Sequence, residues 1–138
     1  MDDCIFCKIV SGDIPCHTIY EDDEYLGFLD IRPVSKGHCL LIPKKHFETF
    51  LDLPVEMMGG FTAALRKVTE AVVKATTCDG VNIGLNVNKA AGQEVFHVHH
   101  HVIPRFEGDG LSQWARNTYD AGEDLILREK ISSFLKEE

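Results

Sequence analysis

The sequence predicts an α+β domain built on a mostly antiparallel five-stranded sheet, with one long helix, a short N-terminal helix and a helical C-terminal tail. Five short segments rich in apolar and β-branched residues are separated by Gly, Pro and acidic residues, which is the pattern of strands. One long segment instead repeats its apolar residues every three or four positions, the spacing of an α-helix. The length of 138 residues is that of one compact domain.

The N-terminal part of the chain carries a helical turn and three strand signals. Residues 5–10 are predicted to form the short helix, which ends at Ser11 and Gly12. An acidic turn joins the first two strands, and Gly37 and Pro43 bound the third. The three predicted strands cover residues 18–20, 25–29 and 38–42.

The long helix is predicted from Val55 to Thr76. Asp52 is its expected N-cap, and Pro54 is tolerated in the first turn. Its apolar residues lie on one face, which is expected to pack on the sheet. They are Met58, Phe61, Leu65, Val68, Val72 and Ala75.

Two more strands and the tail follow the long helix. Residues 81–87 alternate between apolar and polar, as a half-buried strand does. Residues 95–103 are predicted to form the last long strand, ended by Pro104. The tail is predicted to be helical in two pieces, about 111–119 and 123–136.

Composition and charge restrict the partners. A content of 44% hydrophobic and 26% charged residues is that of a globular protein, and no apolar run approaches the ~20 residues of a membrane span. The net charge of −8 argues against nucleic-acid binding, which needs clustered Lys and Arg. A few local donors can still bind a small anion. We therefore expect no nucleic-acid partner and no membrane partner.

The five cysteines are an odd number, which argues against a complete disulfide framework. We expect a reducing, cytoplasmic setting, in which the pair Cys4-x-x-Cys7 is a possible metal or redox site. The other cysteines are expected to be small buried hydrophobic residues: Cys16, Cys39 and Cys78.

Four of the seven histidines lie together at residues 97–101. On a strand, alternate side chains share a face, so His99 is expected to lie between two other histidines. The two faces would carry His97, His99 and His101 on one side and Val98, His100 and Val102, packed on the core, on the other.

The residues alone leave three interpretations of this segment. A tag remnant or chance enrichment is disfavoured, because the segment is internal and flanked by strand-forming residues. A three-histidine metal site could activate water, although strand residues four apart would need strong bending to share one ion. A nucleophilic imidazole could instead attack a phosphoryl centre and carry a covalent intermediate.

Residues 97–103 read His-Val-His-His-His-Val-Ile and resemble the histidine triad pattern His-φ-His-φ-His-φ-φ, where φ is apolar. The resemblance implies a histidine triad domain over residues 3–105, with 106–138 as a C-terminal helical extension of the same domain. Two residues depart from the pattern: His100 replaces an apolar residue, and Glu94 stands where many relatives have Ser or Thr. Further segments are similar, in order, to the Hint-type branch of this family: residues 4–9, 20–23, 28–33, 37–38, 41–46 and 91–93.

The resemblance implies a hydrolase or transferase that acts on the α-phosphate of purine nucleoside phosphoramidates or adenylated substrates through a nucleotidyl-histidine intermediate. His99 is the implied nucleophile, His101 the α-phosphate donor and His38 a proton relay. Asp30 is implied to bind the ribose hydroxyls, since a carboxylate near phosphate would repel it. The other implied nucleotide-binding residues are Ile31, Phe6, Phe28, Asn86, Gln93 and Val95.

The resemblance also implies one structural zinc ion per chain and a homodimer. The pair Cys4 and Cys7 is weak support for zinc by itself. His46 and His97 stand where branches of the family with this cysteine pair complete a Cys₂His₂ site. The dimer is implied to form through the long helix and the strand at 81–87.

Three other functions stay open at this point. Dinucleoside polyphosphate hydrolysis would be separated from phosphoramidate hydrolysis by the rates on the two substrates. A three-histidine metal hydrolase would be inhibited by chelators and would form no covalent intermediate. A non-catalytic module would bind purine nucleotides without turnover.

Overall fold

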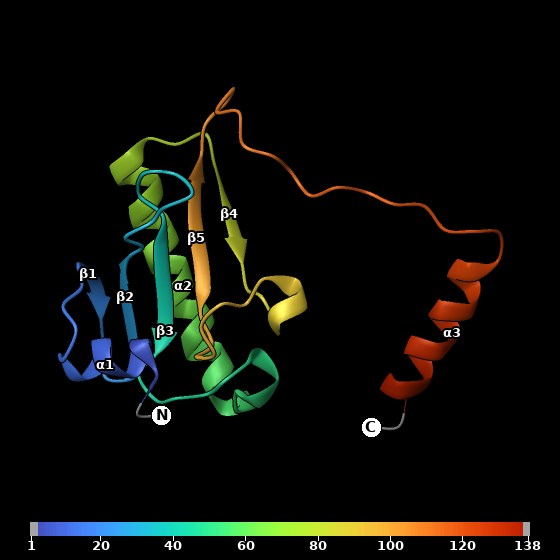
Figure 1. The fold of residues 1–138 in the computed structure, drawn as a ribbon, viewed down its shortest axis with the longest axis horizontal. Coiled ribbons are helices and arrows are strands. Elements are labelled where there is room, and N and C mark those ends of the chain that lie inside the picture. The colour runs from blue at the N-terminus through green and yellow to red at the C-terminus, as the bar shows by residue number, and fades with distance from the viewer. Residues whose placement is uncertain (1–2, 137–138) are drawn as a thin grey trace.

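The computed structural model describes residues 3–136, so residues 137 and 138 of the expected extension lie outside it. None of the helices in the described part is long and apolar enough to cross a membrane. Figure 1 shows a body of sheet and helices and a C-terminal segment that leads away from it. The elements are α1 (Ile5–Ser11), β1 (Thr18–Glu21), β2 (Tyr25–Leu29), β3 (Cys39–Pro43), η1 (Phe50–Asp52), α2 (Val55–Thr76), β4 (Gly80–Gly84), η2 (Lys89–Ala91), β5 (His100–Arg105) and α3 (Glu123–Leu135), where η marks a 3₁₀ turn.

The five strands form one antiparallel sheet in the order β1-β2-β3-β5-β4, which confirms the predicted α+β class. His101 on β5 lies opposite Leu40 of β3 on one side and Gly84 of β4 on the other. The sheet therefore holds His101 between two strands, while β1 and β4 are its edges.

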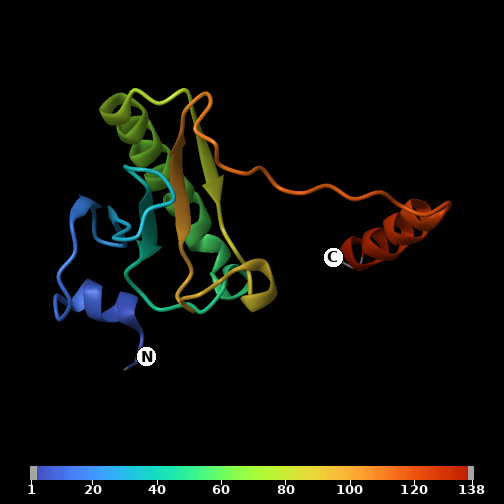
Figure 2. The same ribbon diagram turned by 45° about the horizontal axis from the view of Figure 1, so that its top comes forward.

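Helices cover the two faces of the sheet, α2 on one and α1 on part of the other (Figures 1 and 2). Side chains alternate along β3, so Leu41 packs in the cluster beside α2, whereas Leu40 and Ile42 pack with Phe6 of α1. The cluster beside α2 is made largely by Phe61, Ala64, Leu65, Val68 and Val72 of the helix with Val98 and Val102. Along β5 the same alternation turns Val102 toward α2 and His101 toward the α1 face.

The long helix has the predicted bounds but not the predicted cap. Its N-cap is Pro54, which makes no side-chain cap hydrogen bond. The Asp52 carboxylate instead accepts from the backbone N–H and the hydroxyl of Thr49, both at 3.0 Å, and closes a capping box in η1. The Asp52 prediction was wrong because this 3₁₀ turn intervenes before the helix begins. Ala75, in the last turn, is exposed.

The last strand begins and ends later than predicted, at His100 and Arg105. Before His100 the backbone pairs elsewhere, since the Val98 N–H donates to the Phe47 carbonyl at 2.8 Å. Pro104 lies inside the strand because β5 pairs only with β4 beyond Val102, where a residue without an N–H is tolerated. His97 and His99 therefore precede the regular strand.

The C-terminal segment has one helix rather than the two predicted pieces. Residues 123–135 are helical as expected, whereas residues 111–120 form no helix or strand. An isolated helix of about nine residues is marginal in water, and these residues are exposed apart from the half-buried Leu111. We name residues 112–135 the C-terminal arm.

The turn before β3 depends on Gly37. Its φ of +101° lies in the left-handed region, and a Cβ there would come within 2.8 Å of the Thr76 side chain. Glycine therefore allows the chain to turn tightly against the end of α2 and to place the next residue, His38, on the α1 face beside His101.

Candidate active site and metal centre

Four side chains from three distant segments meet at the start of α1. Cys4 and Cys7 flank the first turn of the helix, where the Cys7 N–H donates to the Cys4 sulfur at 3.3 Å. His97 Nδ1 lies 3.4 Å from the Cys4 Sγ and 3.6 Å from the Cys7 Sγ, and His46 Nδ1 lies 3.3 Å from the Cys7 Sγ. All four potential ligand atoms lie within 4.8 Å of one another. These are the four residues predicted to bind zinc.

The spacing and chemistry of these atoms fit zinc. Ligands 2.0–2.3 Å from a tetrahedral centre are about 3.3–3.8 Å from one another, which matches the observed S–N distances. His97 donates its Nε2–H to the Pro43 carbonyl at 2.7 Å, so the lone pair is on Nδ1 and faces the cysteines. Burial, together with Cys4, raises the pKa of the Cys7 thiol to about 11, so zinc must displace a proton to bind there.

The metal centre is joined directly to the predicted nucleophile. His99 donates its Nδ1–H to the backbone carbonyl of His97 at 2.8 Å. A neutral imidazole that donates from Nδ1 has its lone pair on Nε2. Burial lowers the pKa of His99 below its ordinary value, although the His97 carbonyl and nearby Asp30 oppose this shift. His99 therefore offers an unprotonated Nε2.

A second hydrogen-bonded chain sets the proton on His101. The Val34 N–H donates to His38 Nδ1 at 3.1 Å, so His38 must carry its proton on Nε2. That proton is donated to His101 Nδ1 at 2.9 Å, which leaves the His101 proton on Nε2. Burial, with smaller effects of His99 and His38, lowers the pKa of His101 to about 4, so the ring is neutral at pH 7. His101 is thus a hydrogen-bond donor at Nε2.

The positions of the ring protons on His38 and His97 argue against a catalytic metal ion bound by the histidines. Asp30, His38 and His101 lie close enough together to suggest a second metal cluster. However, His38 Nε2 carries a proton because its Nδ1 accepts from Val34, and a protonated nitrogen cannot ligate an ion. His97 also fails as a member of a three-histidine site, since its lone pair faces the cysteines.

The residues predicted to bind the base and the sugar form two different parts of the site, an aromatic wall beside His99 and the carboxylate of Asp30. Phe6 packs edge-on against His99, with ring centroids 5.1 Å apart, and Phe28 lies behind Phe6 at 5.6 Å. Asp30 accepts the Arg32 N–H on Oδ1 at 2.9 Å, and its Oδ2 lies 3.8 Å from His38 Nε2, beyond hydrogen-bond distance. Ile31 is 84% exposed beside it. One wall is thus aromatic, and Asp30 Oδ2 receives no hydrogen bond from the residues that the structure describes.

The other predicted nucleotide-binding residues divide into two groups. Asn86 lines a groove of about 860 Å³ together with His38 and His101. Gln93 is buried, and both hydrogens of its amide are used, since Nε2 donates to the carbonyls of Glu48 and Val95. The Gln93 amide therefore holds the loop between β4 and β5, and Val95 packs against the cluster that contains Phe6.

His100 turns away from this site, as expected. Its ring packs against Phe61 of α2 with centroids 4.6 Å apart. Its Nδ1 is buried and has no hydrogen-bond partner among the described residues, and burial lowers the pKa of His100 to about 4. The ring is neutral and serves as packing, but without the hydrogen bond that a buried histidine usually makes.

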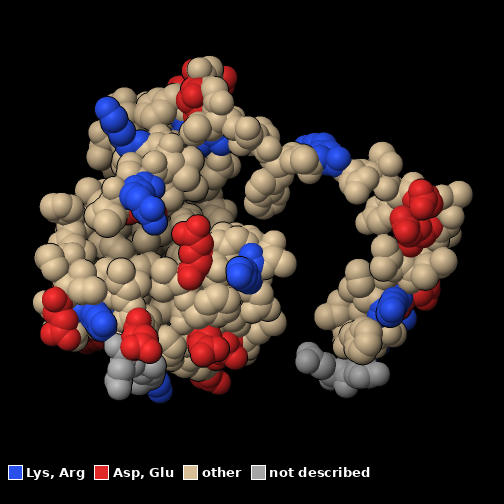
Figure 3. Space-filling view, viewed as in Figure 1, with Lys and Arg blue, Asp and Glu red and all other residues tan. Residues whose placement is uncertain are grey.

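Three groups that orient the histidines could not be found from the sequence. They are the Val34 N–H, the Pro43 carbonyl and the His97 carbonyl. Every residue has a carbonyl and nearly every residue an N–H, so side-chain identity carries no signal for such contacts. Charge does not mark the site either, because Lys and Arg are interspersed with Asp and Glu on the face shown in Figure 3.

Comparison with known proteins gives a family match. A family model described as the HIT domain matches residues 11–108. An Arabidopsis thaliana protein named adenylylsulfatase HINT3 is 45% identical over 114 residues, which cover 83% of this chain and 57% of that protein. The chain thus spans little more than half the length of this relative.

Two solved structures match the chain through its C-terminal arm. A crystal structure from Streptococcus mutans is 41% identical, covers 98% of this chain and 87% of that chain, and has a TM-score of 0.90. A histidine triad family protein from Mycobacterium smegmatis, described as Zn-bound, is 42% identical, covers 99% of both chains and has a TM-score of 0.76.

The first prediction concerns the metal. Native protein should contain about one zinc ion per chain, and Cys4→Ser combined with Cys7→Ser should lose it, because two of four ligands are removed. Elemental analysis and thermal melting should show both zinc loss and a lower melting temperature. The matched control, Cys16→Ser with Cys78→Ser, should retain zinc. Full zinc content in the first double variant would contradict the ligand assignment.

Proposed function

This chain belongs to the HIT family, and we propose that it hydrolyses or transfers the nucleotidyl group of purine nucleoside phosphoramidates or related adenylated substrates. One observation carries the proposal: the ring of His99, whose Nε2 is bare, lies beside the ring of His101, whose Nε2 carries a proton. Their rings are 4.9 Å apart at the centroids. A nucleophile and a donor to the phosphate oxygens are the two groups that this substitution at phosphorus needs.

The reaction has two steps. His99 Nε2 attacks the α-phosphorus, a P–N bond to His99 forms, and the bond from phosphorus to the leaving amine breaks. The amine keeps the bonding electrons and takes a proton from solvent, for which the hydrogen-bonded His38–His101 pair is the proposed relay. Water then attacks the nucleotidyl-histidine, releases the nucleoside monophosphate, returns a proton to solvent and restores His99. His101 Nε2–H stabilises charge on a phosphate oxygen in both steps.

The sugar is assigned to the side of the site that carries Asp30. The free Oδ2 of this half-buried carboxylate can accept hydrogen bonds from ribose hydroxyls, whereas the same charge would repel phosphate. Phe6 supplies the aromatic wall beside His99, against which a purine can pack. Zinc, held by Cys4, Cys7, His46 and His97, is assigned the structural task of fixing His97.

The leaving group is assigned on the side of Glu94. The negative charge of this exposed carboxylate acts on His99, since it raises the pKa of that ring against the effect of burial. A cationic amine is favoured beside such a charge and an anion is disfavoured. We therefore expect phosphoramidates to react faster than adenylyl sulfate, the substrate class named for the Arabidopsis relative. Faster turnover of dinucleoside polyphosphates would favour the alternative hydrolase.

We also propose that the chain works as a homodimer in a reducing, cytoplasmic setting. The supporting feature for the dimer is the edge strand β4, on which Ile83 is half exposed. Edge strands with unpaired backbone groups readily pair with another chain. The five free cysteines, all in the described part of the chain, support the reducing setting.

The second prediction concerns the nucleophile. With adenosine 5′-phosphoramidate, His99→Ala should abolish both turnover and the covalent nucleotidyl adduct, yet keep nucleotide affinity within a few fold. His101→Ala should slow turnover by about 10²–10³, the effect of removing one donor to a developing charge. Intact-protein and peptide mass spectrometry should place the adduct on His99. The exposed His17 provides a control, since His17→Ala should react normally.

An adduct on His101 or His38 in the native enzyme would overturn this assignment. Binding of the nucleotide without any adduct or turnover would favour a non-catalytic module.

The third prediction concerns the sugar. Asp30→Ala should weaken ribonucleotide binding by about 1.5–3 kcal/mol, the range for a hydrogen bond to a charged group. Binding of the 2′,3′-dideoxy analogue should weaken much less, because it lacks the hydroxyls. Calorimetric titration of both ligands separates sugar recognition from a general change in the loop. Asp30→Asn serves as the control of the same shape without the negative charge. Equal losses for both ligands would remove Asp30 from the sugar site.

A further inference from the structure

The two cysteines at the start of α1 are placed to bond to each other. Cys4 is the N-cap of the helix and Cys7 is its third residue, so both side chains leave the backbone within one turn. The Cys7 N–H donates to the Cys4 sulfur at 3.3 Å, and the two sulfurs belong to a group of ligand atoms that all lie within 4.8 Å of one another. Side-chain rotation within this turn can therefore bring the sulfurs to bonding distance, about 2 Å, without moving another segment.

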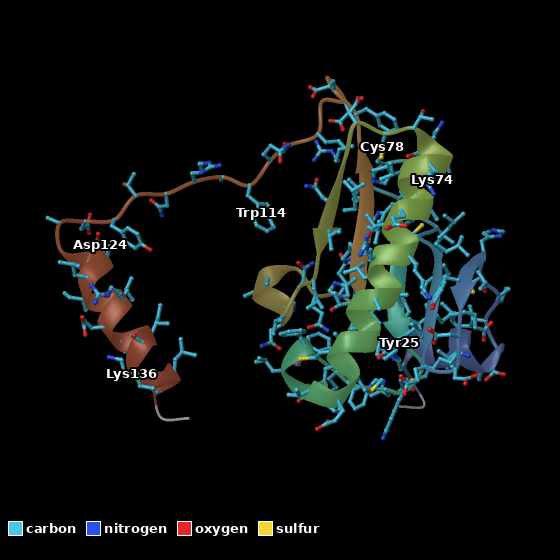
Figure 4. All side chains as sticks on the ribbon, turned by 180° about the vertical axis from the view of Figure 1, so that it is seen from behind. Tyr25, Lys74, Cys78, Trp114, Asp124 and Lys136 are labelled. Carbon is cyan, nitrogen blue, oxygen red and sulfur yellow. The ribbon has the colours of Figure 1, made fainter. Side chains whose placement is uncertain are left out.

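Both cysteines are also within reach of a small molecule from solvent. Cys4 and Cys7 are half-buried, whereas Cys39 is only 2% exposed. Cys16 and Cys78 are half-buried as well, but they precede β1 and β4, the opposite edges of the sheet, so they cannot bond to each other within one chain. Figure 4 shows Cys78 beyond the C-terminal end of α2, at the other end of the body from α1. Cys4 and Cys7 therefore form an accessible neighbouring pair.

Zinc binding and a disulfide exclude each other at this pair. Zinc takes both sulfurs as thiolates, the charged form that reacts with oxidants. A disulfide has no negative charge to offer the metal, and only His46 and His97 would remain of the four ligands. A structural zinc site needs four ligands, so closure of the disulfide expels the ion.

Loss of the ion reaches the predicted nucleophile through His97. The His97 ring is fully buried, and its Nδ1 lone pair lies 3.4 Å from the Cys4 Sγ and 3.6 Å from the Cys7 Sγ. Its proton is on Nε2, donated to the Pro43 carbonyl, and the sulfurs of a disulfide have no proton to give. Nδ1 would then be a buried acceptor without a partner, which destabilises this position of the ring. The carbonyl of the same residue accepts the Nδ1–H of His99, so a shift of His97 disturbs the hydrogen bond that orients His99.

We propose that Cys4 and Cys7 form a peroxide-sensitive site, at which oxidation to a disulfide expels zinc and releases the orientation of His99. One thiolate attacks hydrogen peroxide, the O–O bond breaks, and a sulfenic acid forms with loss of hydroxide. The second thiolate attacks that sulfur, the S–S bond forms, and a second hydroxide leaves. The two sulfurs lose two electrons, peroxide gains them, and two protons from solvent convert the hydroxides to water. Zinc leaves as the free divalent ion.

A reducing setting keeps this site in its zinc form. Zinc binds only the reduced pair, so it stabilises that state by mass action. Reductants reverse the disulfide, after which zinc binds again. The effect on turnover rests on the proposed function, whereas zinc release and disulfide formation do not depend on it.

Oxidation of the zinc-loaded full chain tests the site. Hydrogen peroxide is added in graded amounts, zinc release is followed with a fluorescent indicator, and disulfides are mapped by alkylation and peptide mass spectrometry. One zinc ion should be released per disulfide, and the linked peptides should contain Cys4 and Cys7, while the other cysteines remain free to be alkylated. Reduction with tris(2-carboxyethyl)phosphine and added zinc should restore the metal content.

The variant Cys16→Ser with Cys78→Ser is the matched control, since it keeps the pair and removes the other half-buried cysteines. It should release zinc at a peroxide concentration within twofold of the native value. Zinc retained while thiols are lost, or zinc released without a disulfide between Cys4 and Cys7, would overturn the proposal. A disulfide that joins Cys16 to either residue would overturn it as well.

The link to His99 has its own readout. In two-bond ¹H–¹⁵N spectra the ring signals of His99 should change on oxidation and return on reduction. Turnover of adenosine 5′-phosphoramidate should fall at least tenfold and recover in the same way. Unchanged His99 signals after zinc release would overturn the link. A zinc-loaded enzyme that turns over no phosphoramidate would contradict the proposed function, while the His99 signals would still decide the link.

Discussion

The hydrogen bond from His99 Nδ1 to the His97 carbonyl is the interaction on which the active site depends. It determines which nitrogen of His99 carries the lone pair, and so which atom of this proposed nucleophile is available to attack phosphorus. The carbonyl is held in place because the His97 side chain is fixed from both sides, by the Pro43 carbonyl at Nε2 and by the cysteine pair at Nδ1. The Cys₂His₂ cluster at the start of α1 thereby orients the proposed nucleophile through His97, without contacting it.

The opposite tautomer of His101 follows from the same kind of constraint. A backbone N–H from the loop before β3 forces His38 to donate, and His38 then forces His101 to present its proton on Nε2. His99 and His101 are both buried enough that the pKa of each falls below its ordinary value. The proposed nucleophile and the proposed donor are therefore both neutral, which suits attack on an anionic phosphate because no charge must be removed first.

Much of the fold could be predicted because apolar side chains repeat with the period of a helix or of a strand. The face of α2 with Phe61, Leu65 and Val68 was evident from helical spacing, and the order of the five strands, the short first helix and the long helix was correct. The start of β5 was misplaced because residues 95–99 have strand-like composition, yet the Val98 N–H donates to the Phe47 carbonyl in the loop after β3. Residues 111–119 were assigned a helix that has no surface to pack on.

The residues of the site could be predicted from the sequence, but the nitrogen that carries the proton in each histidine ring could not. Cys4, Cys7, His46 and His97 were assembled from resemblance, and the structure brings them together. Backbone groups set the tautomers, and no sequence pattern marks them. Two-bond ¹H–¹⁵N correlation spectra of the histidine side chains in zinc-loaded protein near pH 7 test this account most directly. It predicts that His99 is protonated at Nδ1 and bare at Nε2, with the reverse for His101; a proton on His99 Nε2 would contradict it.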